Sequence, residues 1–367
     1  MNELTNLIGL AGYSIIFAKN KAMDRNKLSR IYLIVLMIAI FVVYTYRKNQ
    51  PHEMVVRGTT MGGTIGYTVK YLDKKQRNLK PQIDSLLADF NQALSTYVPD
   101  SEISLFNQTG KHSFKQPYFY EVLEASRVVY EKTNGAFDPT VGPLINAWGF
   151  GEGGFMGPDS AQVDSLLQFV GFEKLSFDSS EVRTSQTGLK LNFSAIAKGQ
   201  AIDVVVNWLL SQGLENCMVE IGGEVHARGQ NLDGDAWVIG IEVPDEQRIG
   251  GIFDAVRLEN AGLATSGNYR NFRVLEDGRK VAHTINPKTG FPQMQTLLSA
   301  TVVAPNCMLA DGYATACMVL GKDKSIELIE ADPNLECYLI FADENGHIDT
   351  YISGGLRGKT VKTEKSE

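Results

Sequence analysis

Hydrophobic residues recur every three or four positions in five segments of the chain, which places them on one face of a helix. This spacing predicts helices over 83–94, 119–129, 202–210, 307–320 and 324–331. Gly135 and Gly213 follow two of these segments closely, and glycine commonly ends a helix.

Short runs rich in Val, Ile and Leu predict strands. They cover 189–193, 218–221, 237–243, 256–258, 298–303 and 337–341. The alternating segment 55–72 is interrupted by Gly62 and Gly63, which predicts a hairpin. Because strands and helices mix without strict alternation, we expect an α+β fold rather than a doubly wound sheet.

The most hydrophobic part of the chain is 31–46, a run without a charged residue that ends in tyrosines. Its length falls a little below the roughly 20 residues of a full membrane span. Positive charges are more numerous before it than after it, which directs the N-terminus to the cytoplasm. We therefore expect a retained transmembrane anchor. A cleaved signal peptide is the alternative, but no small-residue cleavage site follows the run. No cysteine follows it either, which excludes lipoprotein attachment.

These features divide the 367 residues into five parts. We expect a basic cytoplasmic lead at 1–30, a transmembrane anchor at 31–46, a linker at 47–54, a body at 55–358 and a polar tail at 359–367. The basic stretch from Met23 resembles an ordinary short lead, so 1–22 are interpreted as an overextended start.

Composition is that of a folded protein, with 44% hydrophobic and 21% charged residues. Acidic residues exceed basic ones by 42 to 35, which argues against a nucleic-acid partner. The four cysteines form no C-x-x-C pair, so a zinc site is not expected. We expect buried thiols, with a disulfide as the alternative in an oxidising compartment.

Three short motifs contain residue types suited to binding anions or metals or to acid–base catalysis. Lys198 lies in SAIAKG, at the predicted start of a helix, where backbone N–H groups favour anions. Asp311 and Thr315 stand four residues apart on one helix face and offer oxygen ligands that suit magnesium. His283 lies beside the turn sequence NPKTG, and imidazole is the usual general base near neutral pH.

Each motif alone has a plainer explanation. Lys198 fits a solvated lysine in a strand-to-helix turn, Thr315 can bond back to the preceding helical turn, and a lone histidine such as His283 is more often structural. No G-x-G-x-x-G follows a strand, so a Rossmann dinucleotide site has no support.

Taken together, eight ordered motifs resemble one family. They are GTTMG at 58–62, STYVPDSE at 95–102, GAFDPTVGPL at 135–144, SAIAKG at 194–199, EIGGE at 220–224, ATSGNY at 264–269, HTINPKTG at 283–290 and ADGYAT at 310–315. The chain is similar to the FAD:protein FMN transferases, the ApbE family, from about residue 55 to about residue 355. The resemblance implies an ApbE-like mixed-sheet body with the flavin in a central cleft.

The resemblance also implies the reaction and its residues. The family splits FAD at its pyrophosphate, joins FMN to a threonine or serine hydroxyl of a target protein and releases AMP. The carbonyl of Ala195 with Asp311 and Thr315 matches its magnesium site, and His283 matches the group that activates the acceptor hydroxyl. The positions that match FAD contacts are Met61, Tyr97, Ala136, Phe137, Asp138, Asn192, Lys198 and Ile285.

Three departures from the family pattern stand out. Asn192 replaces a frequent aspartate and Ala314 replaces a second acid of some members, which leaves fewer anionic ligands for magnesium. The lipoprotein cysteine is also missing, which changes the mode of anchoring.

Two other functions stay open. They are an FAD pyrophosphatase that releases FMN and AMP, and a flavin-binding protein without turnover. The expected acceptors are subunits of membrane redox complexes of the Nqr or Rnf kind. The expected location is the bacterial inner membrane, with the catalytic body facing the periplasm.

Overall fold

The computed structural model describes residues 25–48, 50–151, 154–244, 251–268, 272–274, 280–293, 296–343 and 346–361. Residues 1–24, and with them most of the predicted basic lead, lie outside the described residues, as does Tyr269 of the sequence motif at 264–269. The chain divides into two compact units, an N-terminal unit, Met1–Pro51, and a large unit, His52–Glu367.

The N-terminal unit contains α2 (Arg25–Lys48). The large apolar side chains between Ile31 and Tyr44 are all about half-exposed or more. Among the residues that the structure describes, no helix is both long and apolar enough to cross a membrane. The predicted transmembrane anchor at 31–46 is therefore not supported. At 1.5 Å per residue its sixteen residues extend about 24 Å, short of a hydrocarbon core about 30 Å thick.

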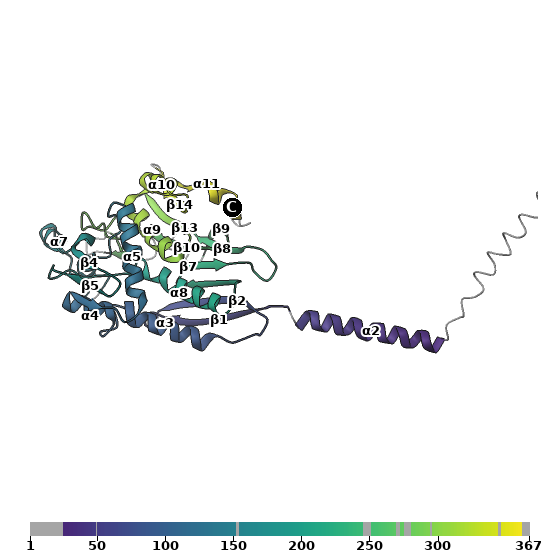
Figure 1. Cartoon of the computed structure of the whole chain (residues 1–367). Coiled ribbons are helices and arrows are strands. Elements are labelled where there is room, and N and C mark those ends of the chain that lie inside the picture. The colour runs from purple at the N-terminus through teal and green to yellow at the C-terminus, as the bar shows by residue number, and fades with distance from the viewer. Residues whose placement is uncertain are drawn as a thin grey trace, which may run out of the picture. The chain divides into compact units, whose positions relative to one another are not determined.

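The large unit is an α+β body, as predicted (Figure 1). Its described helices are α3 (Lys80–Leu94), α4 (Glu102–Thr109), α5 (Pro117–Lys132), α6 (Gly142–Ala147), α7 (Ser160–Leu167), α8 (Ala197–Ser211), α9 (Cys307–Leu320), α10 (Lys322–Glu330) and α11 (Gly354–Arg357), with a single 3-10 turn, η1 (Phe172–Lys174).

Its described strands form four sheets. They are β1 (His52–Thr60), β2 (Ile65–Asp73), β3 (Lys111–Ser113), β4 (Leu175–Phe177), β5 (Glu181–Thr184), β6 (Cys217–Ile221), β7 (Glu224–Arg228), β8 (Trp237–Glu242), β9 (Ile252–Leu258), β10 (Ala261–Gly267), β11 (Phe272–Val274), β12 (Lys280–Ala282), β13 (Leu297–Ala304), β14 (Glu336–Ala342), β15 (Ile348–Ile352) and β16 (Thr360–Val361). The largest sheet has the order β1-β2-β6-β7-β10-β13-β14-β15 and the others are β16-β9-β8, β3-β5-β4 and β11-β12.

Near its centre the large sheet is covered on both faces, which explains why a strand such as β14 reads as a continuous hydrophobic run. In β14, Cys337 and Leu339 belong to the core shared with α3, α5, α8 and α9, whereas Tyr338 and Ile340 belong to a second core shared with β8 and β9. Successive side chains of a strand point to opposite faces, so both sets are buried.

The predicted hairpin at 55–72 is confirmed, because β1 pairs antiparallel with β2 across a turn at residues 61–64. The first residues of the predicted polar tail form β16, which pairs with β9. The predicted strand at 189–193 is wrong. At its centre, the Asn107 side chain donates to Leu191 O at 2.9 Å and accepts from Leu191 N at 2.7 Å. Lys190 forms an isolated bridge with Val141, so the segment does not join a sheet.

Candidate functional site

The start of α9 is held against α8 and β10 by two glycines. A Cβ added to Gly199 would lie 2.2 Å from the carbonyl oxygen of Cys307, and one added to Gly262 would lie 2.2 Å from the backbone nitrogen of Cys307. Both distances are far below normal contact, so only glycine permits this approach. In Figure 1, α8 and α9 lie beside the central strands, consistent with their packing against β7 and β10.

Asp311 lies one turn into α9 and is buried. The backbone N–H of Gly199 donates to its carboxylate at 3.1 Å. Burial raises the pKa of Asp311 to about 7, with Lys198 opposing the rise and Glu224 adding to it. A buried carboxylate beside other acids favours the binding of a cation, because a cation removes the cost of burying the charge.

Lys198 lies in the first turn of α8 and forms an ion pair with Glu224, the first residue of β7. Although burial acts to lower it, the pKa of Lys198 is raised by the neighbouring carboxylates of Glu224 and Asp311. Glu224 is buried, and its second carboxylate oxygen has no hydrogen-bond partner in the described structure. The positively charged ammonium is thus held among acidic side chains.

The predicted magnesium ligands lie on α9 and just before the start of α8. Thr315 lies one turn beyond Asp311 on α9, and its hydroxyl is 3.2 Å from that of Ser266 on β10. Ala195 lies two residues before α8 and is partly buried. The described residues contain no group of three or more His, Cys, Asp or Glu side chains placed to hold a metal. One carboxylate, one hydroxyl and one carbonyl suit Mg²⁺, which usually takes its other ligands from water and substrate phosphates.

Asp138 and Asn192, both predicted to contact FAD, lie on adjoining loops, since Asn192 N donates to Pro139 O at 2.8 Å. The Asp138 carboxylate accepts from the Thr140 hydroxyl at 2.6 Å and from Phe172 N at 3.1 Å. Burial raises the pKa of Asp138 to about 6. Its neighbours Ala136 and Phe137 are also buried. The sequence did not reveal that Asp138 is engaged in holding its own loop.

His283 and Ile285 belong to the turn at 283–290. The His283 ring is partly buried, and its centre lies 6.3 Å from that of Phe150, nearly edge to face. Ile285 is buried in a small core with Leu144 and Trp148. The Trp148 indole donates to Gly290 O at 2.9 Å, which fixes the far end of the turn.

Met61 and Tyr97 lie on turns beside α3. Met61 has a positive φ of 50° in the β1–β2 turn, which is joined to α3 by a 3.1 Å bond from Asn91 to Thr60. Tyr97 follows the C-terminus of α3 and is 76% exposed, so its ring is available to a ligand.

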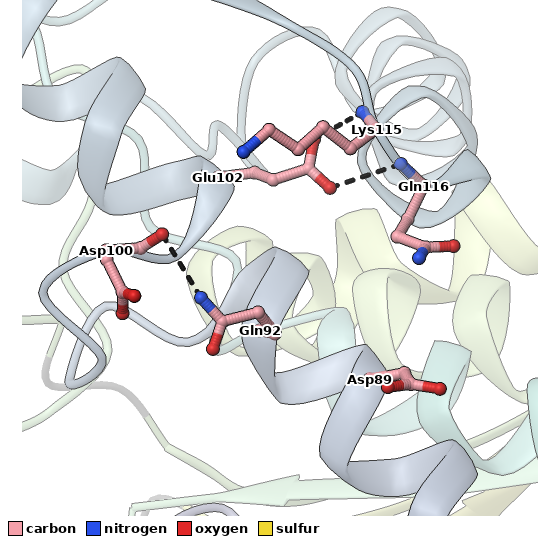
Figure 2. A pocket seen from close by; sticks show the side chains of 6 residues that line it. All are labelled: Asp89, Gln92, Asp100, Glu102, Lys115 and Gln116. Atoms are coloured by element: carbon pink, nitrogen blue, oxygen red, sulfur yellow. Dashed lines mark hydrogen bonds between the residues drawn. The ribbon is translucent and has the colours of Figure 1, made fainter.

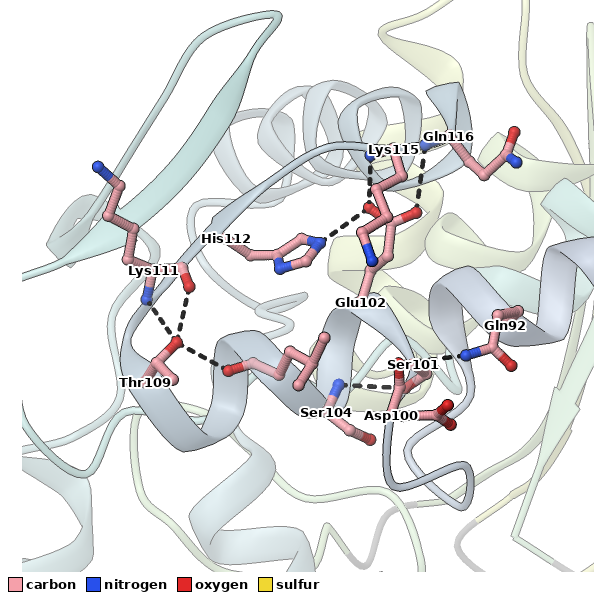
Figure 3. A network of polar contacts seen from close by, with 11 residues as sticks. Gln92, Asp100, Ser101, Glu102, Ser104, Thr109, Lys111, His112, Lys115 and Gln116 are labelled. Carbon is pink, nitrogen blue, oxygen red and sulfur yellow. Dashed lines mark hydrogen bonds and ion pairs between the residues drawn. The ribbon is translucent and has the colours of Figure 1, made fainter.

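Gln92 and Glu102 hold the segments that follow Tyr97: Gln92 bonds to the loop after α3 and Glu102 to the start of α5. Figure 2 shows the side chains lining a cavity of about 120 Å³, where Gln92 donates to Asp100 O at 3.1 Å. Figure 3 shows Glu102 accepting from His112 at 3.0 Å and from the backbone of Lys115 at 2.9 Å. Glu102 therefore anchors the start of α5, a structural role within the motif at 95–102. None of the residues lining this cavity is a predicted flavin contact.

The four cysteines are buried and form no disulfide, as expected for apolar core residues. Burial raises the pKa of Cys217 to about 12 and that of Cys317 to about 11. These thiols are therefore not nucleophiles at neutral pH.

Comparison with known proteins decides the family. The ApbE family model matches residues 61–339. The chain belongs to the ApbE family. The resemblance inferred from the eight motifs is thus confirmed, and the matched region contains every predicted site residue.

Individual relatives agree over most of the chain. The chain is 36% identical to the FAD:protein FMN transferase of Haemophilus influenzae, over 85% of this chain and 94% of the relative. It is 39% identical to the protein of the same name from Vibrio cholerae, over 77% and 86%. The solved structure of the flavin transferase ApbE from Vibrio cholerae superposes with a TM-score of 0.74 at 34% identity, covering 84% of this chain and 99% of that one.

Proposed function

We propose that the protein transfers FMN from FAD to a threonine or serine hydroxyl of a target protein. The hydroxyl oxygen forms a bond to the phosphorus of the FMN half, the bond from that phosphorus to the AMP oxygen breaks, and AMP leaves. The observation that carries the proposal is the buried cluster of Lys198, Glu224 and Asp311, placed at the α8–α9 contact within the region that matches the family.

Within this cluster, Lys198 binds the pyrophosphate. Its ammonium is held at the start of α8, where backbone N–H groups also favour anions. Phosphoryl transfer depends chiefly on positioning and on neutralising charge, and a lysine and a helix start supply both. Glu224 keeps Lys198 in place until the phosphate arrives.

The Ala195 carbonyl, Asp311 and Thr315 would hold magnesium. The donor set fits a hard cation, and burial, which raises the pKa of Asp311, makes a nearby positive charge favourable. When bound, magnesium would offset the charge that develops toward AMP.

His283 takes the proton of the acceptor hydroxyl. Its partly buried ring lies on the turn at 283–290, whose far end is fixed by the bond from Trp148 to Gly290 O. Such proton transfer contributes about 10²–10⁴-fold to a rate. Met61, Tyr97, Ala136, Phe137, Asp138, Asn192 and Ile285 would surround the flavin, an assignment that rests on the family motifs.

One experiment separates the candidate activities. The full chain is incubated with FAD, magnesium and a subunit of a membrane redox complex of the Nqr or Rnf kind. In-gel flavin fluorescence and chromatography then locate the flavin. We expect a fluorescent acceptor band and one AMP for each FMN attached. Free FMN with AMP would mean a pyrophosphatase, and unchanged FAD would mean a binding protein.

The proposed location is the bacterial inner membrane, with the catalytic body on the periplasmic side. The half-exposed apolar side chains of α2 support membrane contact, because such a surface is costly in water. The test is cell fractionation followed by mass spectrometry of peptides before Ile31. A mature protein that starts near Gln50 would mean that this segment is cleaved.

A further inference from the structure

Asp203 is a buried aspartate of α8 that none of the sequence motifs assigns to the reaction. Its carboxylate accepts from Cys307 N at 2.9 Å and from Met308 N at 2.8 Å. It also accepts from the ring Nδ1 of His226, at 2.6 Å. A single side chain thus joins α8, the start of α9 and strand β7.

The bonds of Asp203 complete the first turn of α9. The first four N–H groups of a helix have no partner within the helix. In α9 the first two donate to Asp203, and the third donates to the Asn306 side chain at 2.9 Å. The aspartate charge also interacts favourably with the positive end of the helix dipole.

The same face of α8 contacts α9 a second time. Gly199 stands four residues before Asp203, so both lie on one side of the helix. Its N–H donates to Asp311, and its missing Cβ leaves room for the backbone of Cys307. Asp203 and Gly199 together fix how α9 lies along α8, and hence where Asp311 stands relative to Lys198.

We propose that Asp203, oriented by His226, is a positioning residue that sets the candidate magnesium ligands Asp311 and Thr315 of α9 against Ala195 and Lys198. The inference rests on the proposed function, because it assigns a purpose to the geometry of that site. Partners that orient metal ligands indirectly typically change metal affinity by about 10–100-fold.

His226 supports Asp203 from the sheet. It is buried on β7, opposite Gly262 of β10, the other residue that packs against Cys307. Its Nδ1–H donates the hydrogen bond to Asp203. Its Nε2 has no hydrogen-bond partner among the described residues. Among the described residues, the hydrogen bond to Asp203 is thus the only one that the His226 ring makes. An asparagine at this position can also donate an N–H to Asp203.

The test compares two buried aspartates in the full-length protein. Asp203→Asn keeps one acceptor oxygen and loses the other, so one N–H of α9 loses its partner. The control is Asp73→Asn, since Asp73 accepts two backbone N–H groups, at 3.0 Å each, and the Arg77 side chain at 2.7 Å, away from the candidate site. The readouts are the melting temperature, Mn²⁺ binding by electron paramagnetic resonance, and the magnesium concentration that gives half-maximal transfer.

We expect Asp203→Asn to raise the half-saturating magnesium concentration and the Mn²⁺ dissociation constant at least tenfold. Asp73→Asn should lower the melting temperature and leave both metal values unchanged. Equal metal binding in the two variants would overturn the proposal. If the wild-type protein itself neither binds Mn²⁺ nor needs magnesium, the proposed function fails instead.

A second pair of variants decides the matter should Asp203→Asn not fold. His226→Asn keeps an N–H donor close to the place of Nδ1, whereas His226→Leu removes it. We expect near-normal Mn²⁺ binding in the first variant and at least tenfold weaker binding in the second. Equal binding in the two variants would show that His226 only fills space.

Discussion

Gly199→Ala tests the contact that brings the site together. The new Cβ would lie 2.2 Å from the Cys307 carbonyl oxygen and 2.7 Å from the Met308 Cα. The first distance is more than about 1 Å short of van der Waals contact. Because these atoms are helix backbone, no side-chain rotation relieves the overlap, and α9 must move away from α8.

The expected loss of stability follows from two opposing effects. Overpacking costs about 1–3 kcal/mol, and a rigid backbone neighbour favours the upper end of this range. Alanine gains about 1 kcal/mol over glycine within a helix. We therefore expect a net loss of about 2 kcal/mol, which lowers the melting temperature by roughly 4 °C in a large domain. A displacement of about 1 Å at Asp311 can slow transfer by about 100-fold.

The assay is differential scanning calorimetry with FMN transfer measured on the same samples. Gly354→Ala is the matched control, since no atom lies within 4 Å of its added Cβ. It should melt and react as the wild type does. If Gly199→Ala also melts and reacts normally, α8 and α9 do not approach each other as described.

Three further substitutions have distinct expected results. Asp311→Ala should abolish magnesium-dependent transfer, because Thr315 and a carbonyl supply no anionic ligand; a normal rate at limiting magnesium would refute the metal assignment. His283→Ala should slow transfer about 10²–10⁴-fold with FAD affinity preserved, as checked by fluorescence titration. A parallel fall in FAD binding and melting temperature would make His283 structural. Asp138 has a folded pKa of about 6, above its unfolded value of about 3.9, so folding favours its protonated form. Stability without FAD should therefore fall as the pH rises from about 4 to about 6. Asp138→Asn should reduce that fall in a urea titration at each pH, and the part that remains is expected from Asp311, whose pKa is also raised.

The pattern of hydrophobic residues predicted the principal elements well. The helix at 307–320 has the predicted bounds, and the hairpin at 55–72 forms. Where prediction failed, features other than the hydrophobic pattern decided the structure. Residues 189–193 have the composition of a strand, yet the Asn107 side chain, 84 residues away in sequence, takes both backbone hydrogen bonds of Leu191. Strand β10 was missed because Ala261–Gly267 consists mostly of small residues rather than Val, Ile or Leu. One of them, Gly262, leaves room for the start of α9 to pack closely against the strand.

The candidate site, too, was predicted only in part from the sequence. Lys198, Asp311 and Thr315 could be singled out by residue type and by resemblance to a family. The partners that fix their geometry could not, because they lie on other elements. Glu224 is 26 residues from Lys198, and Asp203 is over 100 residues from the backbone it supports. Only the sheet order β6-β7-β10 and the α8–α9 contact bring them together.

The most direct test of the central claim is the intact mass of an acceptor protein after incubation with FAD and magnesium, with AMP measured in the same reaction. The account predicts that the acceptor gains one FMN through a phosphoester on a threonine or serine, with an equal amount of AMP released. An unmodified acceptor alongside free FMN and AMP would contradict it.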